Sequence, residues 1–156
     1  MLLALKFGGQ VGLGCVLGSI LAGHPGFNAI SPDTLIPIPL HKQRLKERGY
    51  NQALEIARPL AKKMRIPLQM NLLTRIRNTP PQSGLTTAHR QRNILQAFQC
   101  CQKTQGRHIL LVDDTFTTGA TLEAASAALL HAGAARVSVA VISRTPRRYG
   151  PPLPKS

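Results

Sequence analysis

The chain has 156 residues, of which 43% are hydrophobic, and this predicts one folded domain with a sizeable core. Twenty Lys and Arg residues against six Asp and Glu give a net charge of +14, which favours an anionic partner: a phosphorylated small molecule, nucleic acid or an anionic membrane surface. The three cysteines form no C-x-x-C pair, which argues against a disulfide framework and predicts a reducing, cytoplasmic compartment.

The first apolar segment is residues 11–22, VGLGCVLGSILA. It is shorter than the ~20 residues that cross a membrane, and no clear positively charged region precedes it as in a signal peptide. Its glycines do not have the spacing of a dinucleotide-binding loop. We therefore interpret it as a helix that packs through small residues, and we expect no membrane insertion.

Three further elements are predicted between residues 34 and 76. Residues 34–38 form a short buried strand, and residues 72–76 form another. Residues 51–64 form a helix, in which Pro59 is expected to cause a kink or a division. The apolar face of this helix consists of Ala53, Leu54, Ala57, Leu60, Ala61 and Met64.

Residues 78–93, NTPPQSGLTTAHRQRN, are polar and rich in turn formers, which predicts a long loop. Loops of this length in compact domains are usually functional or disordered. A short strand over residues 94–98 is expected to follow it.

The clearest unit begins with a buried strand over residues 108–112 and a loop over 113–121. A helix over 122–132, with Gly133 at its C-terminal cap, leads to a second buried strand over 137–142. Two apolar strands without alternation, separated by a helix, predict a βαβ unit in a parallel sheet. The domain is thus expected over residues 1–145, with a disordered, basic, Pro-rich tail over 146–156.

The loop in this unit begins with two adjacent acids, Asp113 and Asp114. They indicate either a solvated strand end or a site for a ligand with hydroxyls or a cation. Residues 117–121, TTGAT, follow where a helix starts, and unpaired backbone N–H groups there suit a phosphate. A ribose 5-phosphate would match both halves of the loop.

Residues 110–122, LLVDDTFTTGATL, resemble the phosphoribosyl pyrophosphate (PRPP) signature of type I phosphoribosyltransferases. Residues 36–53 and 75–93, together with LKFG at residues 5–8, resemble ordered blocks of the ComF (competence protein F) and GntX-like members. The resemblance implies the type I fold, an α/β architecture with a mostly parallel central sheet flanked by helices. Family members usually carry N-terminal cysteine-rich zinc modules, and no such module is expected here.

The resemblance also implies roles for individual residues. Asp113 and Asp114 would be the catalytic acids, holding the ribose hydroxyls and Mg²⁺, either directly or through water. The 5-phosphate would be bound by Thr115, Thr117, Thr118, Gly119, Ala120 and Thr121. Pyrophosphate would be bound by Arg48, Gly49, Tyr50 and Asn51. A flexible loop over the site would contribute Gln82, Arg90 and Arg92.

The reaction implied is displacement of pyrophosphate from C1 of PRPP by a nitrogen nucleophile, through a transition state that resembles an oxocarbenium ion. Three functions stay open: an active transferase of DNA uptake or nucleotide salvage, a PRPP-binding protein without turnover, and a single-stranded-DNA-binding accessory of competence. The last finds few aromatic residues for base stacking, with two Tyr, four Phe and no Trp. Competence-machinery proteins and a homodimer stay open as partners.

Overall fold

The computed structural model describes residues 11–77 and 97–144. Its centre is a parallel sheet of three strands in the order β1-β4-β5, formed by β1 (Thr34–Pro37), β4 (His108–Phe116) and β5 (Arg136–Arg144). In the register, Ile36 lies opposite Leu111, which in turn lies opposite Val139. The expected parallel βαβ unit is therefore confirmed.

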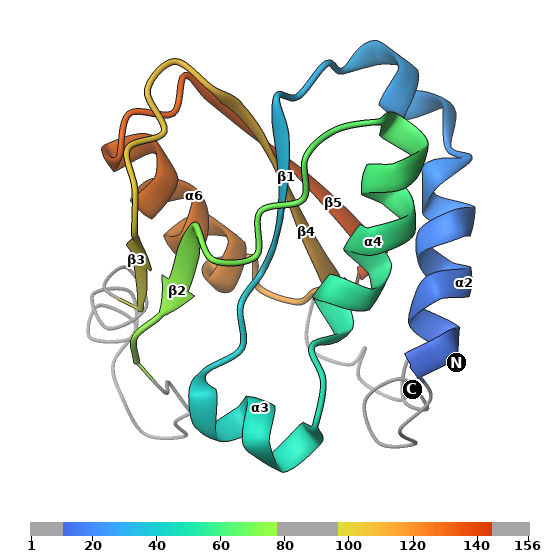
Figure 1. Ribbon diagram of the computed structural model, residues 1–156, viewed down its shortest axis with the longest axis horizontal. Helices are drawn as coiled ribbons and strands as arrows, with labels where there is room; N and C mark the ends of the chain where they lie inside the picture. Colours follow the sequence, from blue (N-terminus) through green and yellow to red (C-terminus); the bar gives the residue numbers. More distant parts are fainter. Residues whose placement is uncertain (1–10, 78–96, 145–156) are drawn as a thin grey trace, which may run out of the picture.

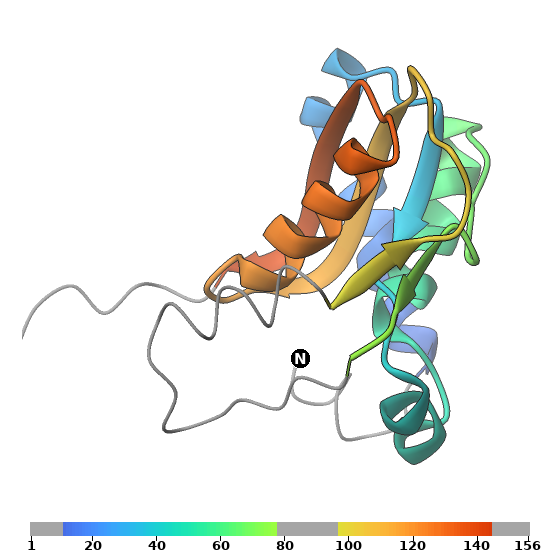
Figure 2. The same cartoon turned by 90° about the vertical axis from the view of Figure 1, so that its left-hand side faces the viewer.

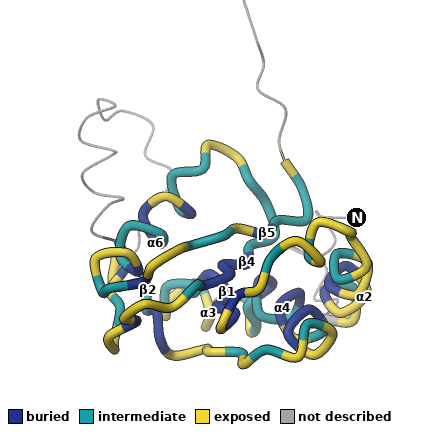
Figure 3. Tube along the Cα trace, turned by 90° about the horizontal axis from the view of Figure 1, so that it is seen from above, coloured by how far each residue is buried: buried dark blue, intermediate teal, exposed yellow. Residues whose placement is uncertain are grey.

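Helices cover both faces of this sheet (Figure 1). The helices α2 (Val11–Ala22) and α4 (Gln52–Met64) pack on one face, and α6 (Ala120–His131) lies on the other. Successive residues of β4 enter different cores: Leu110 packs with Ile56 and Leu60, whereas Ile109 and Leu111 pack with α6. This burial on both faces explains why the apolar run shows no alternation (Figure 3).

A small antiparallel sheet of β2 (Leu73–Arg75) and β3 (Phe98–Cys100) lies beside α6. The short helix α3 (Lys42–Arg48) lies beyond the carboxyl ends of the central strands, and β2 runs toward the same end, whereas its antiparallel partner β3 runs away from it (Figures 1 and 2). A 3-10 turn, η1 (Pro25–Ala29), joins α2 to β1. The carboxyl end of the sheet is therefore bordered by α3 and the end of β2, in addition to residues 110–122.

The packing of α2 on α4 depends on small residues, as expected. A Cβ on Gly14 would lie 2.6 Å from the Cβ of Glu55, and one on Gly18 would meet the Ile56 carbonyl oxygen and Pro59. Pro59 lies within α4, which continues from Gln52 to Met64, so of the two expected outcomes the division does not occur: burial of one face of the helix outweighs the lost backbone hydrogen bond. Among the described residues, no helix has the length and apolar character that crossing a bilayer requires.

Several predicted boundaries need correction. β4 continues through Phe116, because its pairing with β5 extends to Arg144, and the predicted loop over 113–121 shrinks to residues 117–119. The buried face of α4 includes Gln52 and Ile56, while Leu54 and Met64 are only partly buried. Gly133 follows α6 with φ 102°, as a C-terminal cap requires. The predicted loop over 78–93 and the tail over 146–156 lie outside the described residues.

Candidate functional site

The acid pair lies at the carboxyl end of β4, inside the strand. Asp113 and Asp114 are both half-buried, and the backbone N–H of Asp114 donates a 2.9 Å hydrogen bond to Oδ1 of Asp113. Strand alternation puts Asp113 in phase with Ile109 and Leu111, on the face that carries α6 and the small sheet. Two adjacent carboxylates repel each other when both are ionised, so the position suits a ligand that supplies positive charge or hydroxyl donors.

A tight turn joins these acids to α6. Gly119 has φ 83° and is the N-cap residue of α6, so the N-cap position itself supplies no side-chain hydrogen bond to the first turn of the helix. A Cβ at Gly119 would lie 2.8 Å from Cζ of Phe116, so both the backbone conformation and the space favour glycine. Thr118 Oγ1 accepts a 3.4 Å hydrogen bond from the N–H of Ala120. The start of α6, with Thr117, Thr118 and Thr121 beside it, thus offers donors to an anion.

Thr115, which the resemblance places in the phosphate set, lies in β4 opposite Ser143. Its Oγ1 is buried and has no hydrogen-bond partner among the described residues. A buried hydroxyl without a partner costs free energy, so this residue stays a candidate for contact with a ligand.

The segment from Arg48 to Asn51 is linked to the strand that carries the acid pair by hydrogen bonds through Ile38, which follows β1. Gly49 ends α3 in the left-handed conformation, with φ 78°. Asn51 caps α4 through a 3.1 Å hydrogen bond from the N–H of Ala53, and its Nδ2 donates a 3.0 Å hydrogen bond to the carbonyl of Ile38. The N–H of Ile38 in turn donates to the carbonyl of Val112, the residue before Asp113. Backbone pairing therefore brings two segments, 48–51 and 113–119, to one end of the sheet.

Arg75, which the sequence did not single out as a site residue, belongs to this region. Its guanidinium lies over the ring of Phe98, 5.6 Å from the centroid. Burial lowers the pKa of Arg75, nearby Arg44 lowers it further, and Asp113 raises it. The only signal for it in the sequence was its place at the start of the R-x-R block. The flexible-loop residues Gln82, Arg90 and Arg92 lie outside the described residues.

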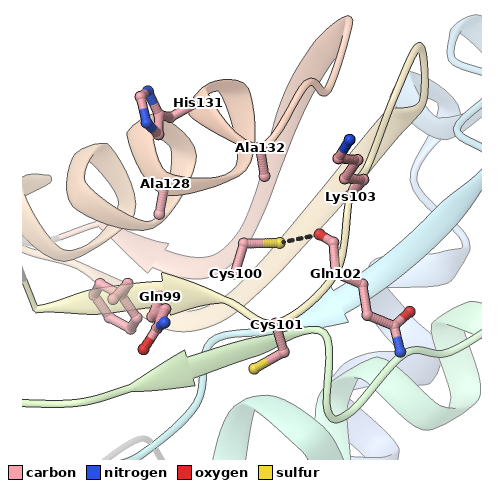
Figure 4. A pocket seen from close by; sticks show the side chains of 9 residues that line it. Gln99, Cys100, Cys101, Gln102, Lys103, Ala128, His131 and Ala132 are labelled. Atoms are coloured by element: carbon pink, nitrogen blue, oxygen red, sulfur yellow. Dashed lines mark hydrogen bonds between the residues drawn. The ribbon is translucent and has the colours of Figure 1, made fainter.

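A surface pocket of about 460 Å³ lies elsewhere, between β3 and the C-terminal half of α6 (Figure 4). Cys100 and Cys101 point to opposite sides of β3, and the Cys100 thiol donates a 3.0 Å hydrogen bond to the carbonyl of Gln102. His131 lies at the end of α6 remote from Gly119. The residues that line this pocket include no acid, so it does not share the chemistry of the strand ends. In the described ranges, no three His, Cys, Asp or Glu side chains group as metal ligands.

Comparison with known proteins gives a consistent result. The family described as "Phosphoribosyl transferase domain" matches residues 51–155. "DNA utilization protein YhgH" of Escherichia coli O157:H7 is 38% identical over 114 residues, which cover 73% of this chain and 50% of that protein. "Competence protein ComFC" of Bacillus subtilis is 37% identical over 124 residues, covering 76% of this chain and 49% of that protein. The chain thus spans about half the length of these relatives.

Among solved structures, the glutamine PRPP amidotransferase of B. subtilis, complexed with ADP and GMP, superimposes with a TM-score of 0.58 at 21% identity. The match covers 83% of this chain and 26% of that one. At this identity the likeness concerns the fold, and it agrees with a parallel sheet flanked by helices.

Proposed function

Because the chain belongs to the phosphoribosyl transferase domain family, in the group that includes the YhgH and competence F proteins, we propose that it binds Mg·PRPP at the carboxyl end of β4 and transfers the phosphoribosyl group to a nitrogen nucleophile. One observation supports this most directly. The acid pair leads, through a three-residue turn with a left-handed glycine, into the start of α6. A ribose 5-phosphate needs this combination of acceptors for hydroxyls and donors for a phosphate.

The 5-phosphate binds at the turn. The first N–H groups of α6 have no partners within the helix, and the partial positive charge at this helix end attracts an anion. The Thr117, Thr118 and Thr121 hydroxyls add donors, and Gly119 lets the backbone approach the phosphate oxygens closely. Ala120 contributes through its backbone, and Thr115 through its buried hydroxyl.

The ribose hydroxyls bind the carboxylates of Asp113 and Asp114. These oxygens also fit Mg²⁺, which typically takes one or two carboxylates together with substrate phosphates and water. When bound, the ion neutralises charge on the departing pyrophosphate. The fit rests on the donor chemistry of the two half-buried carboxylates at the strand end.

The pyrophosphate lies against residues 48–51. Gly49 and Tyr50 form the backbone turn, Asn51 anchors this turn to β1 through the Ile38 carbonyl, and half-buried Arg48 supplies positive charge. The reaction breaks the bond between C1 and the pyrophosphate oxygen, which keeps the electron pair, and forms a bond from nitrogen to C1, while the proton that the nitrogen loses passes to the departing pyrophosphate or to water. The carboxylates stabilise the positive charge that develops on the ribose.

Titration of Mg·PRPP into the protein by calorimetry tests the binding step, and pyrophosphate release in the presence of nitrogenous bases and amines tests transfer. Saturable binding that requires Mg²⁺ is the expected result. Absence of binding would refute the proposed function. If Mg·PRPP binds but no acceptor tested causes the release of pyrophosphate, the result would favour a PRPP-binding protein without turnover.

A second function, binding of single-stranded DNA, is favoured by the charge distribution on α3 and by the similarity to a DNA utilization protein and to competence proteins. Lys42 and Lys46 are exposed one helical turn apart, whereas Arg44 and Arg48 are half-buried. The two exposed lysines are available to phosphates in solution. In this proposal the exposed lysines contact DNA, whereas Arg48 belongs to the PRPP site.

A further inference from the structure

Arg144 lies beside the turn that leads from β4 into α6. It is the last residue of β5, and in the register of the parallel sheet it lies opposite Phe116, the last residue of β4. Its guanidinium lies over the Phe116 ring, 5.3 Å from the centroid. The same ring adjoins Gly119, because a Cβ built on that glycine would lie 2.8 Å from Cζ of Phe116 and 3.0 Å from Cε2. One aromatic ring therefore links the arginine of β5 to the turn over residues 117–119.

The guanidinium of Arg144 is oriented and yet accessible. Arg144 is exposed, whereas Phe116 is half-buried and packs against the core on the α6 face of the sheet. Stacking on an aromatic ring uses the face of a guanidinium and restricts its orientation. The N–H groups point outward in the plane of the guanidinium, so stacking does not cover them. The contact with Phe116 thus orients a cation that an anion in solution can reach.

The chain around the turn is acidic. Residues 113–123, DDTFTTGATLE, include three acids and neither Lys nor Arg. Two of these acids form the pair near the end of β4, and the third, Glu123, lies in the first turn of α6. A helix N-terminus supplies roughly half an elementary charge, whereas a phosphate monoester carries about −1.5 to −2 at pH 7. A cation from a neighbouring element would therefore lower the free energy of a phosphate bound at this turn.

We propose that Arg144 binds the 5-phosphate of PRPP and so selects for a 5-phosphorylated sugar, an inference that rests on the proposed function. A guanidinium can donate two parallel hydrogen bonds to phosphate oxygens, which adds geometric specificity to the attraction of charge. The strand order β1-β4-β5 places Arg144 and the proposed pyrophosphate segment, residues 48–51, on opposite sides of β4. Arg144 therefore acts on the phosphorylated end of the ribose and not on the leaving group.

The test separates the two ends of the ligand. Calorimetry measures the affinity of the full chain for Mg·PRPP, and ribose 5-phosphate and Mg·pyrophosphate are then measured as competitors of Mg·PRPP. We expect Arg144→Gln to weaken the binding of Mg·PRPP and of ribose 5-phosphate by about tenfold or more, as the loss of hydrogen bonds to a charged group allows. The affinity for Mg·pyrophosphate should be unchanged. Urea unfolding of each variant verifies that the fold is retained.

Arg136→Gln is the matched control. Arg136 is the first residue of β5, at the end of the strand remote from Phe116, and it is exposed as Arg144 is. Its replacement removes the same charge from the same strand, so it reports any effect of net charge, and it should leave all three affinities unchanged. Arg144→Lys keeps the charge without the planar group, and should retain part of the affinity for ribose 5-phosphate.

Three results would overturn the proposal while leaving the proposed function intact. The first is equal affinity of Arg144→Gln and wild type for Mg·PRPP. The second is an equal loss for ribose 5-phosphate and Mg·pyrophosphate in Arg144→Gln, which would show that the change perturbs the whole site. The third is a loss in Arg136→Gln as large as that in Arg144→Gln, which would show a general effect of charge. If the wild-type chain does not bind Mg·PRPP, the proposed function fails and this inference fails with it.

Discussion

Replacement of Gly119 by valine is the sharpest test of the proposed phosphate-binding site, which consists of residues 117–119 and the start of α6. Its φ of 83° lies in the left-handed region, where a residue with a Cβ costs roughly 1–2 kcal/mol. The added Cβ would lie 2.8 Å from Cζ of Phe116, whose ring also lies 5.3 Å from the Arg144 guanidinium. We therefore expect Gly119→Val to lower the free energy of unfolding by about 1–3 kcal/mol, which many domains survive.

The effect on ligand binding should be larger than this strain. Relaxation of the turn moves the N–H groups at the start of α6, and each lost hydrogen bond to a charged group costs about 1.5–3 kcal/mol. Loss of two such bonds would weaken Mg·PRPP binding by roughly 100-fold or more. Calorimetry measures the affinity, and urea unfolding measures the stability.

The matched control is Gly106→Val. Gly106 has φ 70°, and an added Cβ there meets nothing within 4 Å. It precedes β4, at the end of the strand opposite the acid pair. This variant should show the backbone cost alone and bind Mg·PRPP as the wild type does. If Gly119→Val also binds Mg·PRPP with normal affinity, the phosphate-binding site lies elsewhere and our account of the turn is wrong.

Three other predictions concern the rest of the site and the basic surface. Asp114→Asn should weaken Mg·PRPP binding by ~1–3 kcal/mol in calorimetry. The control is Asp33→Asn, which should not weaken binding, because Asp33 accepts a 2.7 Å hydrogen bond from the N–H of His108 at the other end of β4. Equal affinities for Asp114→Asn and wild type would contradict the assignment. Asn51→Ala removes an N-cap and the bond to Ile38, so urea unfolding should show a loss of about 1–2 kcal/mol, whereas an unchanged midpoint would show that neither bond matters. If single-stranded DNA is bound through ~4 phosphate contacts, the slope of log K against log salt should be near −3. Changing both Lys42 and Lys46 to alanine should reduce the magnitude of this slope by about 1.4. No salt dependence in fluorescence anisotropy, or a strong preference for one sequence, would contradict this prediction.

The parallel unit and the left-handed turn at Gly119 could be expected from the sequence because local patterns encode them. Strands buried on both faces must be apolar at every position, as in residues 109–112, and a glycine after the threonines indicates a left-handed turn before a helix. The end of β4 could not be predicted from such patterns. Residues 113–116 are polar or adjoin turn formers, and they are extended because β5 continues alongside them to Arg144. The length of a strand depends on its partner.

Helix α3 and the place of Arg75 were missed for a similar reason. Residues 42–48 have no apolar stripe, and the helix begins with a cap by His41 and ends at the left-handed Gly49. Arg75 precedes the long segment over 78–93, and nothing in its neighbours along the chain indicates Phe98 or Asp113. Both the ring contact and the electrostatic effect of Asp113 on the pKa of Arg75 come from residues at least 23 positions away, which only the fold brings near.

The positions of Asp33 and Glu55, compared with those of Asp113 and Asp114, favour a ligand-binding role for the adjacent pair. Asp33 accepts the N–H of His108 at the start of β4, and Glu55 forms an ion pair with Arg58 one turn further along α4. These acids stabilise the structure singly, each against a donor or cation. Asp113 and Asp114 lie next to each other near the end of one strand, where the charge of each ionised carboxylate raises the electrostatic free energy of the other. A ligand that brings hydroxyl groups and a cation to this point would lower that free energy, as the proposed Mg·PRPP complex would.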